Sequence, residues 1–272
     1  MRTRPVIFDH VPNRIDHCFS QLRAQKRTGF IPYICAGDPS LNKTVDLALA
    51  LEKAGTDILE LGIPFSDPLA DGLVNQLAAQ RALEAGATVP GVLDCIRQIR
   101  TRSQIPIVLY TYLNPIFQFG FERFHREASN AGVDGLLILD LPPEEDQPND
   151  GPFHIRLIAP TTPPERIEQI CARAAGFIYY VSREGVTGIQ SSIASSVRDQ
   201  VALIRRHTTL PIAVGFGIST AEQASEVAQV ADAIVVGSAI VQRISENATA
   251  PSMPERVGEF VASLIRAAKA GL

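Results

Sequence analysis

The chain has 272 residues, of which 46% are hydrophobic and 20% are charged, and its formal net charge at pH 7 is −4. This composition is typical of a globular protein long enough to bury one large core, and a mildly acidic chain without a basic stripe is not expected to bind nucleic acid. No apolar run approaches the length of a membrane span, and the N-terminal residues lack the apolar stretch of a secretion signal, so we expect a cytoplasmic protein without membrane contact.

Short apolar runs alternate with longer amphipathic stretches from end to end. The runs are rich in Ile, Val, Leu and Tyr and lack strict polar alternation, which is typical of parallel strands covered on both faces. The eight expected strands are Phe30–Cys35, Asp57–Leu61, Ile107–Tyr112, Gly135–Leu139, Ile155–Ala159, Phe177–Val181, Ile212–Gly215 and Ala233–Val236. The helices expected between them include Thr44–Ala54, Val92–Arg102, Phe121–Ala131, Pro164–Ala174 and Thr220–Gln229. This repetition predicts an α/β fold, a (β/α)8 TIM barrel, as a single domain over residues 1–272.

An extra helix is expected at each end of this pattern. Asn13–Arg27 precedes the first strand as an amphipathic helix that is expected to cap the bottom of the barrel. Its apolar face consists of Ile15, Cys18, Phe19 and Leu22. Pro254–Ala270 follows the last strand as the closing outer helix. An open doubly wound sheet is the alternative fold, but it would not need eight strands, and no GxGxxG follows the first strand.

The connection between the fourth and fifth strands, Pro142–Pro152, is rich in helix breakers. Its prolines and Gly151 would interrupt a helix. We therefore expect at most a short turn at Glu144–Gln147, which leaves this side of the outer ring of helices thin.

The most informative segment is Leu59–Gly72, in which a short buried strand runs into a loop rich in Gly, Pro and Ser. Glu60 lies within the strand, where a charge is costly unless it is paired or functional. The loop carries two further acids, Asp67 and Asp71. A rigid carboxylate at the end of a buried strand, with another on the loop that follows, predicts a site of proton transfer. The alternative is that Glu60 is a barrel carboxylate satisfied by hydrogen bonds and that Asp71 is a turn residue.

Glycine-rich segments follow the last three expected strands. They are Gly185–Gly188, Gly215–Ser219 and Gly237–Ile240. Glycine lets backbone N–H groups approach an anion closely, and the expected helix Ala239–Ile244 would add its N-terminal dipole. Each segment alone is also compatible with a tight turn, but the three together predict a phosphate site.

Neither the cysteines nor the histidines have the spacing of a metal site. The four cysteines lie far apart and none forms a CxxC pair, so we expect free thiols, not a zinc site or a disulfide framework. They are Cys18, Cys35, Cys95 and Cys171. The five histidines are scattered, and no two have the helical spacing of metal ligands.

The segment Leu59–Gly72 closely resembles the signature of the tryptophan synthase alpha subunit family, and the resemblance extends from about Gly29 to the C-terminus. It implies an enzyme of tryptophan biosynthesis, a carbon–carbon lyase that cleaves indole-3-glycerol phosphate to indole and glyceraldehyde 3-phosphate by a retro-aldol reaction. Glu60 and Asp71 match the two catalytic acids of the family. The resemblance implies that Glu60 shuttles protons with a raised pKa, while ionised Asp71 accepts the indole N–H.

The resemblance also implies where the substrate binds. The residues that match the site of the glycerol phosphate are Gly188, Gly217, Gly237 and Ser238. The residues that align with positions around the indole are Tyr33, Tyr110 and Tyr179. Flat aromatic walls suit a flat substrate, and ordinary barrel packing is the alternative for the last two of these tyrosines. The polar segment Ser182–Ser192 resembles a catalytic loop in which Thr187 would hydrogen-bond Asp71 on closure.

The partner implied by the resemblance is a pyridoxal-phosphate beta subunit in an αββα heterotetramer, which receives indole through a tunnel. The resemblance implies no cofactor and no metal in this chain itself. Asp67 and Pro68 match the loop through which the two subunits communicate. We expect this loop and Ser182–Ser192 to be poorly fixed in the isolated chain, because they lack large apolar groups.

Two features depart from the family. The connection at Pro142–Pro152 is shortened, and Asn75 places a polar side chain where an apolar pocket residue is expected. Asn75 is the one hint of an alternative function, a regulatory subunit that activates its partner with little turnover of its own. A further alternative is another phosphosugar barrel of aromatic biosynthesis, an isomerase or an indole-forming synthase. A lysine on a barrel strand would favour the synthase, and none of the eight runs contains one.

Overall fold

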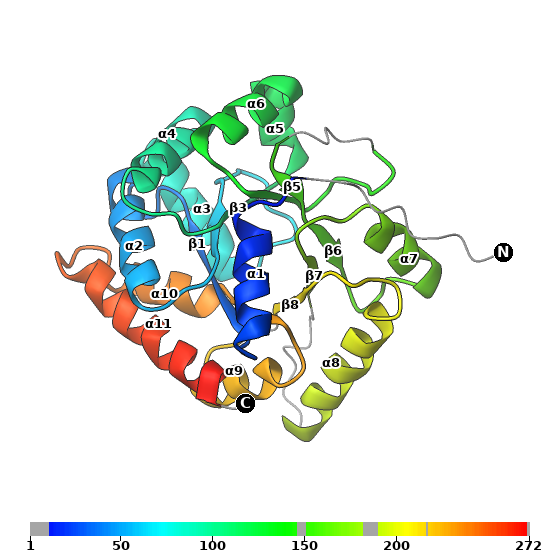
Figure 1. Ribbon diagram of the computed structural model, residues 1–272. Helices are drawn as coiled ribbons and strands as arrows, with labels where there is room; N and C mark the ends of the chain where they lie inside the picture. The colour runs from blue at the N-terminus through cyan, green and yellow to red at the C-terminus, as the bar shows by residue number, and fades with distance from the viewer. Residues whose placement is uncertain (1–10, 146–150, 182–189, 216, 271–272) are drawn as a thin grey trace.

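The computed structural model describes residues 11–145, 151–181, 190–215 and 217–270. Within this part of the chain, nine parallel strands form one sheet in the order β5-β4-β3-β2-β1-β9-β8-β7-β6. The strands are β1 (Gly29–Cys35), β2 (Leu59–Gly62), β3 (Ile107–Thr111), β4 (Gly135–Ile138), β5 (Phe153–His154), β6 (Arg156–Ile158), β7 (Ile178–Val181), β8 (Ile212–Gly215) and β9 (Ala233–Val236). They occupy the centre of the molecule, and the helices surround them (Figure 1). The predicted TIM barrel is confirmed.

The ninth strand arises because the fifth strand of the barrel is divided into two short strands. We predicted one strand at Ile155–Ala159, whereas the structure has β5 and β6 on either side of Ile155. β5 pairs with β4, and β6 pairs with β7. The chain therefore changes partner at Ile155, whose N–H still donates to the carbonyl of Leu136 at 2.9 Å. The two ends of the sheet are parts of one continuous segment, which closes the barrel.

The outer ring contains the predicted helices with ends shifted by a few residues. They are α2 (Leu41–Lys53), α4 (Val89–Arg100), α6 (Phe121–Ala131), α7 (Pro164–Ala172), α9 (Ala221–Ala228) and α11 (Met253–Ala270). Helix α8 (Gln190–Ile204) completes the ring. Three more helices follow strand ends, namely α3 (Leu73–Glu84), α5 (Leu113–Phe119) and α10 (Ser238–Glu246). Among the helices that the structure describes, none has both the length and the apolarity that crossing a membrane requires.

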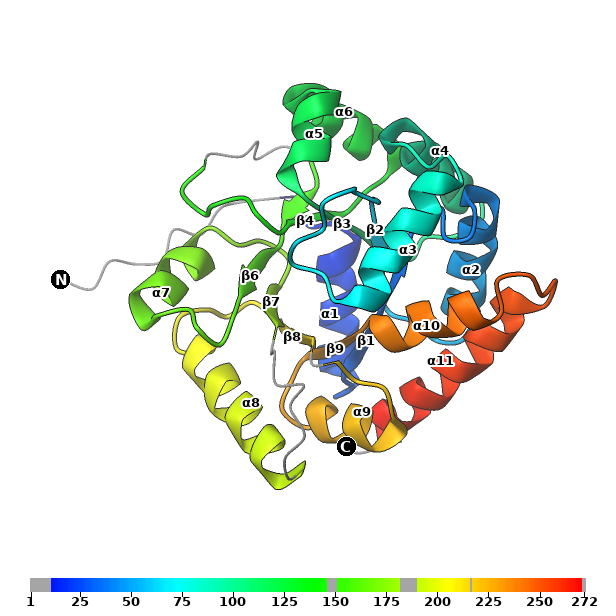
Figure 2. The same ribbon diagram turned by 180° about the vertical axis from the view of Figure 1, so that it is seen from behind.

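The N-terminal helix α1 (Arg14–Ala24) closes one end of the barrel, as predicted. Ile15, Phe19 and Leu22 are buried in one cluster with side chains from the strands. The contact is close, because a Cβ at Gly29 of β1 would lie 2.9 Å from Cδ1 of Leu22. Asn13 fixes the start of the helix through a capping box. In Figure 1 this helix lies in front of the strands, whereas the opposite view in Figure 2 has α3 and α10 in front.

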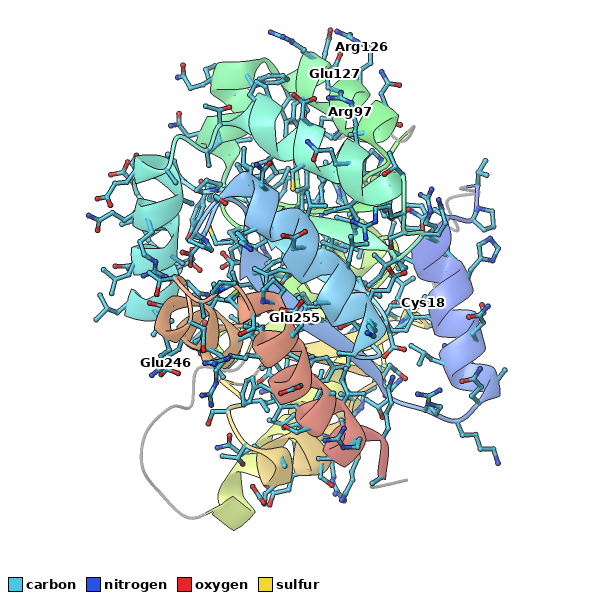
Figure 3. All side chains as sticks on the ribbon, turned by 90° about the vertical axis from the view of Figure 1, so that its left-hand side faces the viewer. Cys18, Arg97, Arg126, Glu127, Glu246 and Glu255 are labelled. Atoms are coloured by element: carbon cyan, nitrogen blue, oxygen red, sulfur yellow. The ribbon has the colours of Figure 1, made fainter. Side chains whose placement is uncertain are left out.

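Ion pairs connect neighbouring helices of the ring. Arg97 of α4 contacts Glu127 of α6 at 2.9 Å, and these two side chains lie side by side on the outer surface in Figure 3. Arg100 of α4 pairs with Asp134, 2% exposed at its side chain, at 2.8 Å. The carboxylate of Asp134 also accepts from the backbone N–H of Ile107. This buried carboxylate therefore fixes α4 to the start of β3.

The connection between β4 and β5 contains only a turn in its described part. The N–H of Glu145 donates to the carbonyl of Pro142 at 3.2 Å. Arg173 of α7 donates to the carbonyls of Pro143 and Glu144, each at 2.9 Å. The predicted turn at Glu144–Gln147 begins one or two residues earlier, and residues 146–150 lie outside the described part of the chain.

Candidate active site

Glu60 lies on β2 with its side chain buried, and only 1% of the residue is exposed. Burial raises the pKa of its carboxyl group from 4.5 to about 8, and the nearby charge of Asp71 adds to the rise. Its Oε1 atom has no hydrogen-bond partner in the described part of the chain. The alternative of a carboxylate satisfied by hydrogen bonds does not describe this atom. A group with this pKa holds a proton at neutral pH and can release it to a bound molecule.

Asp71 lies just before α3 at the end of the loop from β2, and it is 8% exposed. The hydroxyl of Tyr110 donates to its Oδ1 at 2.9 Å, and the hydroxyl of Tyr112 donates to its Oδ2 at 2.7 Å. Tyr112 in turn accepts a hydrogen bond from the backbone N–H of Ala70 at 3.0 Å. Asp71 is therefore held by one side chain from β3 and one from the residue directly after it. A residue that only forms a turn does not need these contacts.

The polar departure at Asn75 contacts the same acid. Its Nδ2 donates to Oδ1 of Asp71 at 3.4 Å, across one turn at the start of α3. The neighbouring Gln76 donates from its side chain to the backbone carbonyl of Asp71 at 2.8 Å. Both residues therefore help to fix the position of Asp71 at the N-terminus of the helix.

The three predicted pocket tyrosines lie close to the two acids. The rings of Tyr33 and Tyr110 meet edge to face, with their centroids 5.0 Å apart. Tyr179 packs against Gly215, where a Cβ would lie 2.9 Å from the tyrosine hydroxyl. Burial raises the pKa of all three hydroxyls well above the ordinary value, and the charges of Glu60 and Asp71 add to the rise. The hydroxyls therefore remain neutral donors.

Three of the four predicted phosphate residues lie at the ends of β8 and β9. Gly217 has a φ of +63°, in the region that favours glycine, and a Cβ there would meet no atom within 4 Å. Gly237 is the N-cap of α10, and Ser238 is the first residue of this helix. The first N–H groups of a helix have no partner within it and point toward an incoming anion. Gly188, the fourth predicted residue, lies outside the described part of the chain.

The two predicted loops are described unequally. Asp67 is exposed, and its carboxylate accepts a hydrogen bond from Ser66 at 2.5 Å. Pro68 is half-buried, and its carbonyl accepts from the N–H of Asp71 at 3.0 Å. Residues 182–189, including Thr187, lie outside the described part. Residues 190–192, which we assigned to the second loop, already belong to helix α8, because the helix begins at Gln190.

Sequence reasoning did not assign Tyr112 to the site and treated Asn75 only as a departure. A signal for each was present. Tyr110 and Tyr112 are two residues apart at the end of a strand, a spacing that sends both side chains to one face. Asp71 and Asn75 are four residues apart, a spacing that brings side chains together where a helix begins.

The described residues contain no group of three or more His, Cys, Asp or Glu side chains that could hold a metal ion. All four cysteines are free. Burial raises the pKa of Cys18, Cys95 and Cys171 to about 12, so these thiols are protonated at neutral pH.

The chain matches a known protein family over nearly its whole length. The model of the family described as tryptophan synthase alpha chain matches residues 19–269. The chain belongs to the tryptophan synthase alpha chain family. Membership makes it an enzyme of tryptophan biosynthesis and implies a beta-subunit partner.

Individual members of the family are similar over nearly the whole chain. The tryptophan synthase alpha chain of Opitutus terrae is 52% identical over 258 residues, which cover 93% of this chain and 96% of the relative. That of Geobacter sulfurreducens is 48% identical, with coverages of 93% and 97%. The crystal structure of the alpha subunit from Legionella pneumophila is 39% identical and superimposes with a TM-score of 0.86, covering 94% of this chain and 98% of that one.

Proposed function

We propose that this chain cleaves indole-3-glycerol phosphate to indole and glyceraldehyde 3-phosphate by a retro-aldol reaction. The observation that carries the proposal is Glu60, a buried carboxyl group whose pKa is raised to about 8, next to Asp71. The reaction needs one group that can give a proton and take one back near neutral pH, and Glu60 has the required pKa. The tyrosines around both acids supply an aromatic pocket for the indole ring.

The proton balance of the reaction requires only Glu60 as a shuttle. Protonated Glu60 gives its proton to C3 of the indole, and the resulting carboxylate takes the proton of the glycerol hydroxyl next to the breaking bond. The bond between C3 and that glycerol carbon then breaks, its electrons return to the ring, and the hydroxyl carbon becomes the aldehyde. Glu60 ends the cycle protonated, as it began.

Asp71 stabilises the intermediate in which the ring carries positive charge. Protonation at C3 places that charge on the ring nitrogen, and a carboxylate that accepts the N–H lowers the energy of this state. Tyr110 and Tyr112 hold the carboxylate in place before the substrate arrives. An acceptor that needs no rearrangement at the moment of reaction is more effective than a mobile one.

The phosphate of the substrate is held at the ends of β8 and β9. Gly217 and Gly237 let the backbone approach the anion, and the N-terminus of α10 adds its dipole through Ser238. Thr187 and Gly188 belong to the same proposal but lie outside the described residues. The chain uses no cofactor of its own for these steps.

The indole passes to a pyridoxal-phosphate beta subunit in an αββα assembly. Apolar side chains are exposed on segments that follow β2 and β3, with Leu69 exposed by 88% and Phe117 by 68%. Exposed apolar groups of this kind at one end of a barrel favour a protein partner there. The loop residues Asp67 and Pro68 lie between β2 and Asp71, so a partner that touches them can influence the acid.

The test is the release of indole from indole-3-glycerol phosphate, with and without a beta subunit. We expect indole in both cases and a faster rate in the complex. If the folded chain released no indole under either condition, the lyase reaction would be excluded. The alternative function, a regulatory subunit with little turnover of its own, would then be favoured. The feature that favoured that alternative, Asn75, contacts the proposed acceptor Asp71.

A further inference from the structure

Asp71 receives three hydrogen bonds from side chains, and they are divided unequally between its two oxygens. Oδ1 receives two, from the hydroxyl of Tyr110 at 2.9 Å and from the amide of Asn75 at 3.4 Å. Oδ2 receives one, from Tyr112 at 2.7 Å. A carboxylate oxygen offers about two positions for donors, so the two donors fill Oδ1 and one position remains on Oδ2.

The orientation of the Asn75 amide follows from its partner. A carboxylate accepts hydrogen bonds, so the NH2 group must face Asp71 and the carbonyl oxygen must point elsewhere. That carbonyl oxygen is buried and has no hydrogen-bond partner within the described residues. A buried acceptor without a partner destabilises a fold, and a leucine, which has the same number and branching of side-chain heavy atoms, would not carry that penalty. Asn75 therefore holds its position at a cost to stability.

Residues that lower the stability of a fold at one place are typical of functional sites. We propose that Asn75 is a positioning residue, which together with Tyr110 fills Oδ1 of Asp71 so that the substrate N–H is received by Oδ2. The proposal rests on the proposed function, because it takes an aromatic N–H as the ligand of Asp71. Asn75 holds the carboxylate from α3 and Tyr110 holds it from β3, so its plane is fixed from two sides.

The decisive variant is Asn75→Leu, because the proposal gives opposite signs for its effects on stability and activity. The change removes the buried unpaired oxygen, so the melting temperature should rise by about 2 °C or more. It also removes one of the two donors that hold Oδ1 of Asp71, so kcat should fall about 5- to 20-fold, with KM raised by a smaller factor. Gln80→Leu is the matched control, since Gln80 is exposed on the same helix and its side chain donates to Glu84 on that helix.

A variant at the second donor tests whether the two side chains act on the same oxygen. In Tyr110→Phe, the hydroxyl is removed and the ring remains. The double variant with Asn75→Leu should lose more kcat than the product of the two single losses, because each donor alone still holds Oδ1. Independent effects would show that the two donors do not share this task and would overturn the proposal.

A binding measurement separates this proposal from the lyase reaction. Benzofuran has the shape of indole with an oxygen in place of the N–H, so the ratio of the two affinities reports the contact to Asp71. We expect the chain to prefer indole about tenfold or more, and Asn75→Leu to lose most of that preference. If the preference depends on Asn75 but no indole is released, the positioning role stands and the lyase proposal fails.

Three results would overturn the positioning role. They are a lower melting temperature for Asn75→Leu, a kcat equal to that of the unaltered chain, and an unchanged preference for indole over benzofuran. A fall in both melting temperature and kcat would mean that Asn75 is needed for folding only.

Discussion

The hydroxyl of Tyr112 donates to Oδ2 of Asp71 at 2.7 Å. The hydroxyl oxygen of Tyr112 also accepts a hydrogen bond from the backbone N–H of Ala70 at 3.0 Å, so one tyrosine fixes both the acid and the loop that carries it. The loop is also the segment that contains Asp67. A movement of this loop can therefore shift the carboxylate of Asp71 through two hydrogen bonds, from Ala70 to Tyr112 and from Tyr112 to Asp71.

Replacement of Glu60 by glutamine should abolish most of the turnover without unfolding the protein. Glutamine fills the same volume but cannot donate and accept a proton in turn, and loss of a general acid–base lowers rates by about 100-fold or more. The measurement is kcat for indole release, with circular dichroism to verify the fold. Near-normal turnover in a folded Glu60→Gln protein would exclude Glu60 as the shuttle.

The same substitution should change how stability depends on pH. The pKa of Glu60 is raised from 4.5 in its ordinary state to about 8 in the fold, so folding takes up a proton between these values. The contribution of Glu60 to stability is complete below pH 4.5 and is lost as pH rises from there through 8, by at most about 5 kcal/mol. The melting temperature of Glu60→Gln, relative to that of the unaltered chain, should therefore increase as pH rises from 5 to 9. Parallel curves would contradict the raised pKa.

Asp71→Asn should damage turnover as severely as the change at Glu60. Its amide NH2 cannot accept the hydrogen bonds that one carboxylate oxygen receives, and it cannot stabilise positive charge on the indole ring. We expect a loss of about 100-fold in kcat with the fold retained. An unchanged rate would leave Asp71 as a turn residue, whatever its contacts to the tyrosines.

Gly217→Val should weaken binding of glycerol phosphate far more than binding of indole. The side chain would stand where the backbone approaches the anion, and the φ of +63° adds strain. Gly86→Val is the matched control, because Gly86 also has a positive φ, of +83°, and open space around its Cβ position, but it lies between α3 and α4. Equal losses for both ligands would mean general damage to the barrel instead of a lost phosphate contact.

Asp67→Ala should remove most of the rise in activity that a beta subunit causes, while the low activity of the isolated chain remains. Asp67 is exposed on the loop that leads to Asp71, and Asp94→Ala on the outer face of α4 provides a control of the same chemistry. Hydrogen exchange should show the exposed residues of this loop, around Asp67, more strongly protected in the complex than in the isolated chain. An isolated chain that is fully active, with these residues as protected as in the complex, would contradict the coupling.

The barrel and its acids were predictable because the relevant patterns are local. Buried parallel strands read as apolar runs, and Glu60 is conspicuous as a charge within one of them. Helix α3 was not predicted, because its apolar residues do not form one stripe. Its alanines, such as Ala78, face the core, whereas Leu73 and Leu77 are exposed.

The hydrogen bonds of the site could not be derived from the sequence, because they join residues that only the closed barrel brings together. Tyr110 and Tyr112 contact an acid about 40 positions away. The division of the fifth barrel strand at Ile155 is likewise a result of closure. It depends on which residues of this segment can pair with β4 and which with β7. Neither feature has a signal in local composition.

Helix α1 closes one end of the barrel and leaves the other end, where the acids lie, open to a ligand. Its apolar side chains and those of the strands fill the lower end, so among the residues that the structure describes a small molecule near Glu60 has no passage along the axis in that direction. A ligand therefore enters and leaves at the same end of the barrel, opposite α1. In the proposed reaction, indole would leave at that end of the barrel, into solvent from the isolated chain or toward a beta subunit bound there. Closure of the α1 end of the barrel therefore restricts the direction of release before any partner is bound.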